Sequence, residues 1–415
     1  MCSSEGEYDM TLTKFTNSYV ITNRAYPSEQ WAYYIYPCAP GALWFYTAPG
    51  QYNGNTAAYN AVNSSPTKIV PPAFAAAITK DLQVAAANGC AQITVYVHGL
   101  ANYFSDTCNE LGTYGTNLLA QGYKGLVIAF DWPSYGEYES YQYYGSLPYS
   151  FPPTNTSGTI RDNINGSVNS FRTLMTILSN ICRQNNAKLN FMCHSEGNYM
   201  LMLAMNRLDF APIPPFINQV LLMASDINTG AVQTTNYSPP WSGQLWNLQA
   251  YATAATVYWS SYDDALPYSE GWTSYHNPSF PNRLGLHGPA SFRLNPDRSD
   301  QLIANAYGLD CSLVVNRTVM NNNGVPPSIT VHSGYFYIPQ VLQDMSRTLN
   351  GASPGNIPNR ASAGQPDGRA YYMKVASSLF TGPMVPKNES LEPQVPEGRD
   401  EVKGSSPELI DGEVQ

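Results

Sequence analysis

The amino-acid sequence predicts an α/β fold with a mostly parallel central sheet flanked by helices. Between roughly residues 90 and 340, β-branched apolar runs alternate with segments of helical periodicity. These runs are apolar almost throughout, which is typical of parallel strands covered on both faces. Hydrophobic residues make up 43% of the 415 residues, enough for a sizeable core. This length allows two or three domains, or one large domain with insertions.

Six strands and two helices are expected in this region. The strands are Gln92–Val97, Gly125–Phe130, Lys188–Cys193, Gln219–Ala224, Ala255–Ser260 and a short Ile329–Val331. One helix is expected over Ile160–Cys182, where apolar residues recur at the i, i+3, i+4 spacing of an amphipathic helix. The other is Glu196–Leu208, which follows the third strand directly. Strands separated by helices indicate parallel crossover connections.

The composition excludes several classes of protein. Lys and Arg number 21 and Asp and Glu 30, a net charge of −9, so the chain lacks the basic surface of a nucleic-acid binder. No apolar run approaches the ~18 residues of a transmembrane segment. The N-terminal residues have neither the basic nor the apolar region of a secretory signal. A soluble protein is therefore expected, cytoplasmic by default, or secreted if a signal peptide has been removed.

The seven cysteines form an odd, scattered set without a C-x-x-C pair. This pattern predicts neither a disulfide framework nor a zinc site.

Four regions are expected along the chain. Residues 1–89 form N-terminal strands and a helix leading into the core, residues 90–352 form the α/β core, and residues 353–385 form an extension packed on it. Residues 386–415 are acidic, rich in Pro and Glu, and without apolar periodicity. Such a segment cannot bury enough surface to offset its chain entropy, so a disordered tail is expected.

Two aromatic-rich stretches follow strand ends, Ser134–Asn155 and Asn228–Asn247. Open α/β sheets bind ligands at the carboxyl ends of their strands. These stretches are either ordinary long loops or an aromatic lid or rim over a site.

The sharpest chemical feature is the pentapeptide Cys193-His194-Ser195-Glu196-Gly197, placed where a strand turns into a helix. In a G-x-S-x-G nucleophile elbow, small flanking residues allow a strained turn that exposes the serine hydroxyl at the sheet edge. Cys193 replaces the first glycine and is small enough for that position. Ser195 is therefore the candidate nucleophile.

A serine nucleophile requires a base, and the chain has five histidines. His332 follows the last predicted strand and completes the chain order serine, acid, histidine, so it is the preferred base. The side chain of His194 is expected to point away on the tight turn, and His98 to support the loop after the first strand. His276 and His287, in a loop-rich stretch, stay open as alternatives.

The acid is expected after a strand between the serine and the histidine. Asp263 and Asp264 both follow the fifth strand, and Asp226 follows the fourth. Asp263 is preferred, with Asp264 and then Asp226 as alternatives. Each could instead cap a helix N-terminus, which is a common position for aspartate.

Other chemistries have little support. The chain has no phosphate-binding P-loop, no dinucleotide-binding G-x-G-x-x-G sequence and no H-x-x-x-H pair. No cofactor and no metal are therefore expected. Paired carboxylates for glycoside hydrolysis cannot be identified, although aromatic loops suit sugar stacking.

Together these residues resemble the α/β-hydrolase superfamily, and within it a bacterial group described as α/β hydrolases of unknown function, with a Trp-Pro-Ser turn and a Ser-Asp-His triad. The matching segments, in order, are Val20–Arg24, Val95–Leu100, Phe130–Ser134, Asp162, Phe191–Asn198, Ser260–Leu266, Arg283–Gly285 and His332–Gly334. The resemblance implies the α/β-hydrolase fold and a Ser195–Asp263–His332 triad. It also implies an oxyanion hole formed by the backbone N–H groups of Leu100 and Glu196.

The hypothesis from the sequence is a serine hydrolase, esterase- or lipase-like, that cleaves a small-molecule or lipid-like carboxylic ester through an acyl-enzyme. The alternatives are a thioesterase, amidase or acyltransferase with the same triad, or a non-catalytic glycan-binding protein on this scaffold. The candidate substrate-pocket residues are His98, Tyr135, Tyr138, Tyr141, Tyr143, Tyr144 and Trp241.

Overall fold

The computed structural model describes residues 17–24, 43–49, 67–100, 102, 104–134, 160–206, 216–234, 244–270, 282–290, 302–364 and 368–374. The chain divides into two units, Met1–Leu379 and Phe380–Gln415, and every described residue lies in the first. The predicted acidic tail, all of the stretch Ser134–Asn155 except Ser134, and residues 235–243 of the stretch Asn228–Asn247 lie outside the described residues. So do Tyr135, Tyr138, Tyr141, Tyr143, Tyr144, Trp241 and His276.

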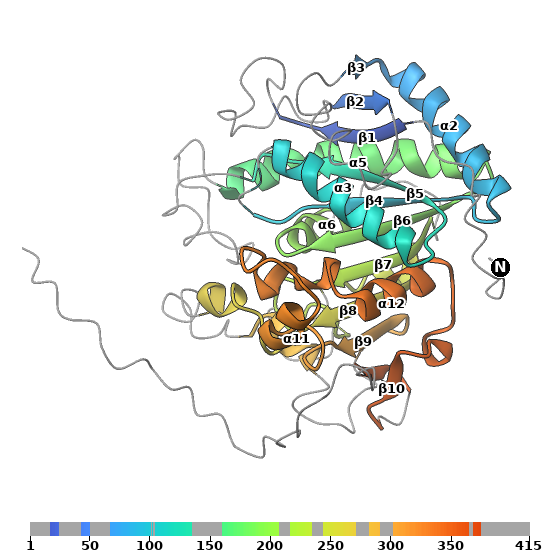
Figure 1. Ribbon diagram of the computed structural model, residues 1–415. Coiled ribbons are helices and arrows are strands. Elements are labelled where there is room, and N and C mark those ends of the chain that lie inside the picture. The colour runs from blue at the N-terminus through green and yellow to red at the C-terminus, as the bar shows by residue number, and fades with distance from the viewer. Residues whose placement is uncertain are drawn as a thin grey trace, which may run out of the picture. The chain divides into compact units, whose positions relative to one another are not determined.

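Among the described residues, eleven strands form one sheet (Figure 1). The strands are β1 (Asn17–Thr22), β2 (Trp44–Pro49), β3 (Thr67–Ile69), β4 (Gln92–Val97), β5 (Leu126–Asp131), β6 (Lys188–His194), β7 (Ile217–Met223), β8 (Ala252–Trp259), β9 (Ala306–Asp310), β10 (Arg360–Ser362) and β11 (Ala370–Met373). Their spatial order is β10-β11-β9-β8-β7-β6-β4-β5-β1-β2-β3.

Eight neighbouring strands, from β11 across to β1, are paired in parallel. The antiparallel pairs β1–β2, β2–β3 and β10–β11 lie at the two ends of the sheet. The predicted mostly parallel sheet is therefore confirmed. β4 lies between β5 and β6, so the chain reverses its direction of travel across the sheet at β4, where α/β folds commonly bind ligands.

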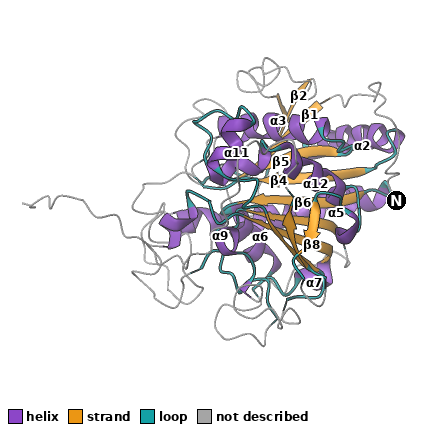
Figure 2. Cartoon of the chain, turned by 60° about the horizontal axis from the view of Figure 1, so that its bottom comes forward, coloured by secondary structure: helices purple, strands orange, loops and turns teal. Residues whose placement is uncertain are grey.

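Helices cover both faces of this sheet (Figure 2). The longer ones are α2 (Pro71–Ala87), α3 (Phe104–Ala120), α5 (Ile160–Gln184), α6 (Gly197–Met205) and α12 (Pro339–Leu349). The shorter ones are α7 (Leu248–Tyr251), α9 (Leu284–His287), α11 (Arg317–Asn322) and the 3-10 helices η2 (Val331–Phe336) and η3 (Pro354–Asn356). The apolar residues of α2, α5 and α6 join one buried cluster, and those of α3, η2 and α12 join another.

The predicted helix over Ile160–Cys182 is confirmed as α5. Its periodic residues Ile164, Val168, Phe171, Met175 and Leu178 are all buried. Five of the six predicted strands are confirmed to within three residues at either end, as β4 to β8.

The sixth predicted strand, Ile329–Val331, is wrong. The 3-10 helix η2 begins at Val331, and its cap residue Thr330 accepts a hydrogen bond from the Ser333 N–H through its side-chain oxygen. Local capping therefore outweighs the β-branched composition of this segment. The parallel strand that follows β8 is instead β9, a short segment with a central glycine that the sequence pattern does not predict.

Among the described cysteines, Cys90 is disulfide-bonded. Cys108, Cys182, Cys193 and Cys311 are free and buried. Within the described part of the chain, no helix has the length and apolar character needed to cross a membrane.

Candidate active site

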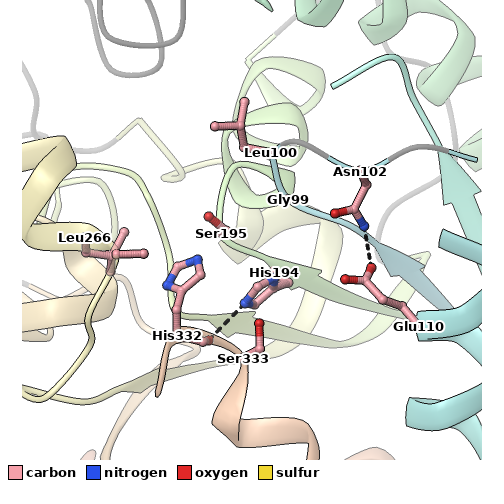
Figure 3. Close-up of a pocket in the computed structure, with 10 residues that line it drawn as sticks. Gly99, Leu100, Asn102, Glu110, His194, Ser195, Leu266, His332 and Ser333 are labelled. Atoms are coloured by element: carbon pink, nitrogen blue, oxygen red, sulfur yellow. Dashed lines mark hydrogen bonds between the residues drawn. The ribbon is translucent and has the colours of Figure 1, made fainter. Parts of the chain in front are cut away.

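A pocket lies at the carboxyl ends of the central strands, and Figure 3 shows it in close-up. Its volume is about 200 Å³. The residues that line it are Gly99, Leu100, Asn102, Glu110, His194, Ser195, Ala265, Leu266, His332 and Ser333. They come from the segments after β4, β6 and β8, and from α3 and η2, so distant parts of the sequence meet here because parallel strands end at the same edge.

Ser195 occupies a sharp turn between β6 and α6. Its φ angle is 52°, in the left-handed region that non-glycine residues rarely adopt. Its N–H donates to the Met223 carbonyl at 3.0 Å. The Asn198 side-chain amide donates to the carbonyls of Ser195 (2.9 Å) and Met223 (3.1 Å). The surrounding hydrogen bonds thus hold a strained backbone that points the hydroxyl into the pocket.

Two glycines leave room for this turn. A Cβ atom on Gly197 would lie 2.4 Å from the Val97 carbonyl oxygen, and one on Gly99 would lie 2.7 Å from the Ser195 Cβ. The start of α6 therefore packs directly against the end of β4. Cys193, which replaces the first glycine of the elbow pattern, is fully buried inside β6. Burial raises the pKa of its thiol, so Cys193 is a small packing residue rather than a competing nucleophile.

His332 and Asp263 are in direct contact. The His332 Nδ1 lies 2.7 Å from the Asp263 Oδ2. The other carboxylate oxygen, Oδ1, accepts the backbone N–H groups of Ala265 and Leu266, both at 2.9 Å. Burial alone would lower the pKa of His332, but the Asp263 carboxylate outweighs it, and the pKa is raised above its usual value.

Ser195 and His332 line the same pocket, and Figure 3 shows the two side chains near each other in it. No hydrogen bond joins these two described side chains. Hydrogen bonds of this kind are often long without substrate and shorten when substrate binds.

The two alternative acids contact other groups. The Asp264 carboxylate accepts the backbone N–H groups of Val331 (2.9 Å) and His332 (3.1 Å), so it holds the backbone of the histidine and not its ring. The Asp226 Oδ1 lies 3.0 Å from the Arg283 Nε. The same oxygen accepts the Ser269 hydroxyl hydrogen bond at 2.8 Å.

His194 corrects a sequence expectation. Its side chain does not point away from the site: it lines the pocket, and its ring centroid lies 4.7 Å from that of His332. Its Nε2 lies 3.1 Å from the His332 carbonyl oxygen (Figure 3). Burial, followed by the proximity of His332, lowers the pKa of His194 to about 3, so its ring is neutral and donates this bond. His287, the other described alternative, pairs with Glu270 at 2.8 Å and does not line the pocket.

His98 is fully buried behind the pocket wall and is not one of the lining residues, contrary to its assignment to the substrate pocket. Its Nε2 accepts the Trp132 backbone N–H at 3.0 Å, and the Asp131 oxygen is farther away, at 3.4 Å. The ring is therefore neutral, and Nδ1 donates to the Gly99 carbonyl at 2.8 Å. His98 thus fixes the peptide that precedes Leu100.

An ion pair supports the same loop. Arg24 and Asp131 are both buried, with Nε and Oδ2 separated by 2.6 Å. Burial alone would raise the pKa of Asp131, but the Arg24 guanidinium lowers it below its usual range. Arg24 also donates to the Asn102 carbonyl at 2.8 Å, which ties the loop after β4 to β1 and β5.

Besides His194, six lining residues were not among the site residues predicted from the sequence: Gly99, Asn102, Glu110, Ala265, Leu266 and Ser333. Glu110 lies inside α3, where a single acidic residue has no spacing signal that would distinguish it from a solvated helix position. Burial raises the pKa of this carboxyl. Among the described residues, no group of three or more His, Cys, Asp or Glu side chains is arranged to hold a metal ion.

Comparison with known proteins gives a family match. Residues 73–274 match the family described as "Alpha/beta hydrolase of unknown function (DUF900)". This region includes Ser195 and Asp263 and ends before His332. No curated protein matches the sequence.

Two solved structures are similar in part. The TT1662 protein of Thermus thermophilus is 14% identical, with a TM-score of 0.29, over 63% of this chain and 90% of that chain. LpqC, a poly(3-hydroxybutyrate) depolymerase from Bordetella parapertussis, is 15% identical, with a TM-score of 0.31, over 69% of this chain and 82% of that chain. At these identities and scores, neither structure assigns an activity to the chain. Residues 73–274 are thus similar to this family, and the mostly parallel sheet with helices on both faces has the α/β-hydrolase fold.

Proposed function

We propose that this protein is a serine hydrolase that cleaves carboxylic esters through Ser195, His332 and Asp263. The observation that carries the proposal is the contact between the His332 Nδ1 and the Asp263 carboxylate, beside a serine on a strained strand-to-helix turn in the same pocket. Such a set recurs on unrelated folds because each member has a separate chemical task.

In the proposed reaction, the His332 Nε2 takes the proton from the Ser195 hydroxyl as its oxygen attacks the acyl carbon. The His332 Nδ1–H donates a hydrogen bond to the Asp263 carboxylate, which keeps the lone pair on Nε2 and stabilises the imidazolium as it forms. The alcohol leaves with the proton from His332, and water then hydrolyses the acyl-enzyme by the reverse proton path.

The oxyanion would be bound by the backbone N–H groups of Leu100 and Glu196. Neither group donates a hydrogen bond to a described backbone or side-chain acceptor, so both are available to a ligand. The His98 bond to the Gly99 carbonyl orients the first donor, and the Ser195 turn orients the second. Each such donor contributes about 3 kcal/mol to lowering the barrier.

The pocket suits a small ester rather than one with a long hydrocarbon chain. Its volume of about 200 Å³ is below the ~300–1,000 Å³ of typical ligand pockets. Apolar side chains come from Leu100, Ala265 and Leu266, and most of the other lining side chains are polar.

A fluorophosphonate probe tests the proposal, because it reacts with a serine only where a base and an oxyanion site activate the hydroxyl. Covalent labelling of the folded protein is expected, with the adduct on Ser195 by peptide mass analysis. Ser195→Ala should abolish labelling, and Ser261→Ala, at an exposed serine, should leave it unchanged. A well-folded protein that does not react would refute the proposal and favour a binding function.

A further inference from the structure

The pocket contains an acidic group that the proposed reaction does not use. Glu110 projects from α3 and lines the pocket together with Ser195 and His332. Glu110 is partly buried. Taking the charge of a carboxylate out of water is unfavourable unless hydrogen bonds or an opposite charge compensate it.

The partners of Glu110 satisfy one of its two oxygens. Oε2 accepts hydrogen bonds from the Tyr96 hydroxyl at 2.8 Å and from the Asn102 side-chain amide at 2.5 Å. Both donors are neutral. The other oxygen, Oε1, accepts no hydrogen bond from a described residue, and Glu110 forms no ion pair within the described part of the chain.

The charged and titratable groups around Glu110 do not neutralise it. Asp106 lies on the same helix and repels its charge, and Tyr96 and Tyr114 are neutral phenols. His98 is also near Glu110, but its ring is uncharged because Nε2 accepts the Trp132 N–H, so it does not offset the charge of the carboxylate. Burial raises the pKa of Glu110, as expected for a carboxyl without a compensating cation.

The residues that hold Glu110 are themselves fixed. The backbone N–H of Asn102 donates to the Ser134 hydroxyl at 3.0 Å, and its carbonyl accepts from Arg24. Tyr96 belongs to the central strand β4, and its ring packs edge-on against Tyr114 at 5.4 Å between centroids. The position of the carboxyl is thus set before any ligand binds.

The pocket has two different sides (Figure 3). Leu266 lies on one side of the Ser195 and His332 pair, whereas Glu110 and Asn102 lie on the other. A substrate whose reacting carbon is at Ser195 therefore meets apolar surface in one direction and a carboxyl group in the other.

We infer that Glu110 is a specificity-determining residue that binds an ammonium group on the substrate. This inference rests on the proposed function and narrows its substrate class to small esters with a cationic amine on the acyl or the alcohol part. The amine N–H would donate to the open Oε1, and its charge would compensate the carboxylate. Charge-assisted hydrogen bonds in a pocket that excludes water are the stronger kind.

Matched pairs of esters test the inference. Dimethylaminopropyl acetate is compared with isohexyl acetate, which has a CH group in place of the NH⁺ group. Ethyl dimethylaminobutyrate is compared with ethyl isoheptanoate for an amine on the acyl side. The expected result is that kcat/KM at neutral pH is at least about tenfold higher for the cationic member of one pair, the ratio that corresponds to ~1.4 kcal/mol.

Variants assign the preference to one side chain. Glu110→Gln keeps the shape and an oxygen for Tyr96 and Asn102 but removes the charge, so the ratio of kcat/KM for the cationic ester to that for the neutral ester should fall to about one. Asp106→Asn removes an equal charge from the same helix outside the pocket and should keep the preference.

Two outcomes separate the inference from the proposed function. Hydrolysis of the neutral esters without a cationic preference, or with a preference that survives Glu110→Gln, would overturn the inference and leave the serine hydrolase in place. If no ester is hydrolysed, binding of dimethylaminopropanol and isohexanol by calorimetry still tests the site. Tighter binding of the amine that is lost in Glu110→Gln would support it, and equal binding would refute it.

Discussion

Two adjacent aspartates contribute to the site in different ways. The Asp263 carboxylate contacts the ring of His332, and the Asp264 carboxylate accepts the backbone N–H groups of Val331 and His332. The first fixes the tautomer and the charge of the imidazole, and the second fixes the position of the chain that carries it. Because one carboxylate acts on the ring and the other on the backbone, substitution of Asp263 should lower the activity more than substitution of Asp264.

Asp263→Asn should lower kcat for p-nitrophenyl acetate about 10⁴-fold, because the amide no longer stabilises the tautomer that leaves Nε2 free. Asp264→Asn should lower kcat about tenfold or less, since it weakens the hydrogen bonds to the backbone of Val331 and His332 without removing the carboxylate that contacts the imidazole ring. Steady-state kinetics on both variants measures the difference. If the Asp264 variant lost as much activity as the Asp263 variant, our assignment of the acid would be wrong.

The pH dependence of activity reports on His332. The base must be unprotonated, so kcat/KM should rise with pH and level off above the pKa of His332, which lies above the usual ~6.5. In Asp263→Asn the carboxylate is lost and burial remains, so the midpoint should move to lower pH. The residual activity of the variant gives this profile, and an unshifted midpoint would contradict the electrostatic account.

At the scale of elements, the site depends on how closely the start of α6 approaches the end of β4. Gly197 allows this contact, since any Cβ would meet backbone carbonyl oxygens of β4 and His98. Backbone atoms cannot move aside as a flexible side chain can. The strained serine therefore requires close packing of two elements as well as its own hydrogen bonds.

Gly197→Ala should destabilise the protein by about 1–3 kcal/mol, the usual range for overpacking, and should lower kcat because the Ser195 turn is displaced. Gly355→Ala, where the nearest atom to the new Cβ would be the Tyr371 hydroxyl at 3.6 Å, is the matched control and should change neither. Thermal unfolding and ester kinetics check this. A Gly197 variant as stable and active as the control would refute the packing argument.

Sequence patterns predicted the elements that are long and apolar, and failed where local bonds decide the structure. β4 to β8 and α5 are defined by their own periodicity, whereas β9 is short and is recognisable only through its pairing with β8 and β11. The segment at 329–331 becomes the start of η2 because Thr330 and Asp264 bind its N–H groups.

In the candidate site, too, some residues could be predicted from the sequence pattern and others could not. The elbow around Ser195 has a local signature, and Asp263 and His332 follow from chain order and resemblance. The proximity of His194 to His332 and the presence of Glu110 in the pocket depend on how η2 and α3 pack, which no local spacing encodes.

At the scale of the described part of the molecule, buried ion pairs tie segments at both ends of the parallel sheet to its core. Arg24 and Asp131 join β1 and β5. Arg360 of β10 pairs with Asp344 of α12 at 2.7 Å, and the Tyr258 hydroxyl of β8 donates to the same carboxylate. Removing one member of such a pair leaves a buried charge uncompensated.

Arg360→Met should therefore lower the free energy of unfolding by about 3–5 kcal/mol, because Asp344 would lose its buried cation. Activity per folded molecule should not change, since neither residue lines the pocket. Arg183→Met, at an exposed arginine, is the control and should shift stability by less than about 0.5 kcal/mol. Chemical denaturation of both variants tests this, and equal stabilities would contradict the role of the pair.

The central claim is that Ser195, His332 and Asp263 act together on an acyl group held by two backbone N–H groups. A crystal structure of the protein after reaction with a phosphonate ester tests this most directly. We predict a covalent bond from the Ser195 oxygen to phosphorus, with a phosphoryl oxygen about 2.7–3.1 Å from the N–H groups of Leu100 and Glu196 and the His332 Nε2 facing the leaving position. An unmodified Ser195, or an adduct with its phosphoryl oxygen turned away from both N–H groups, would contradict the claim.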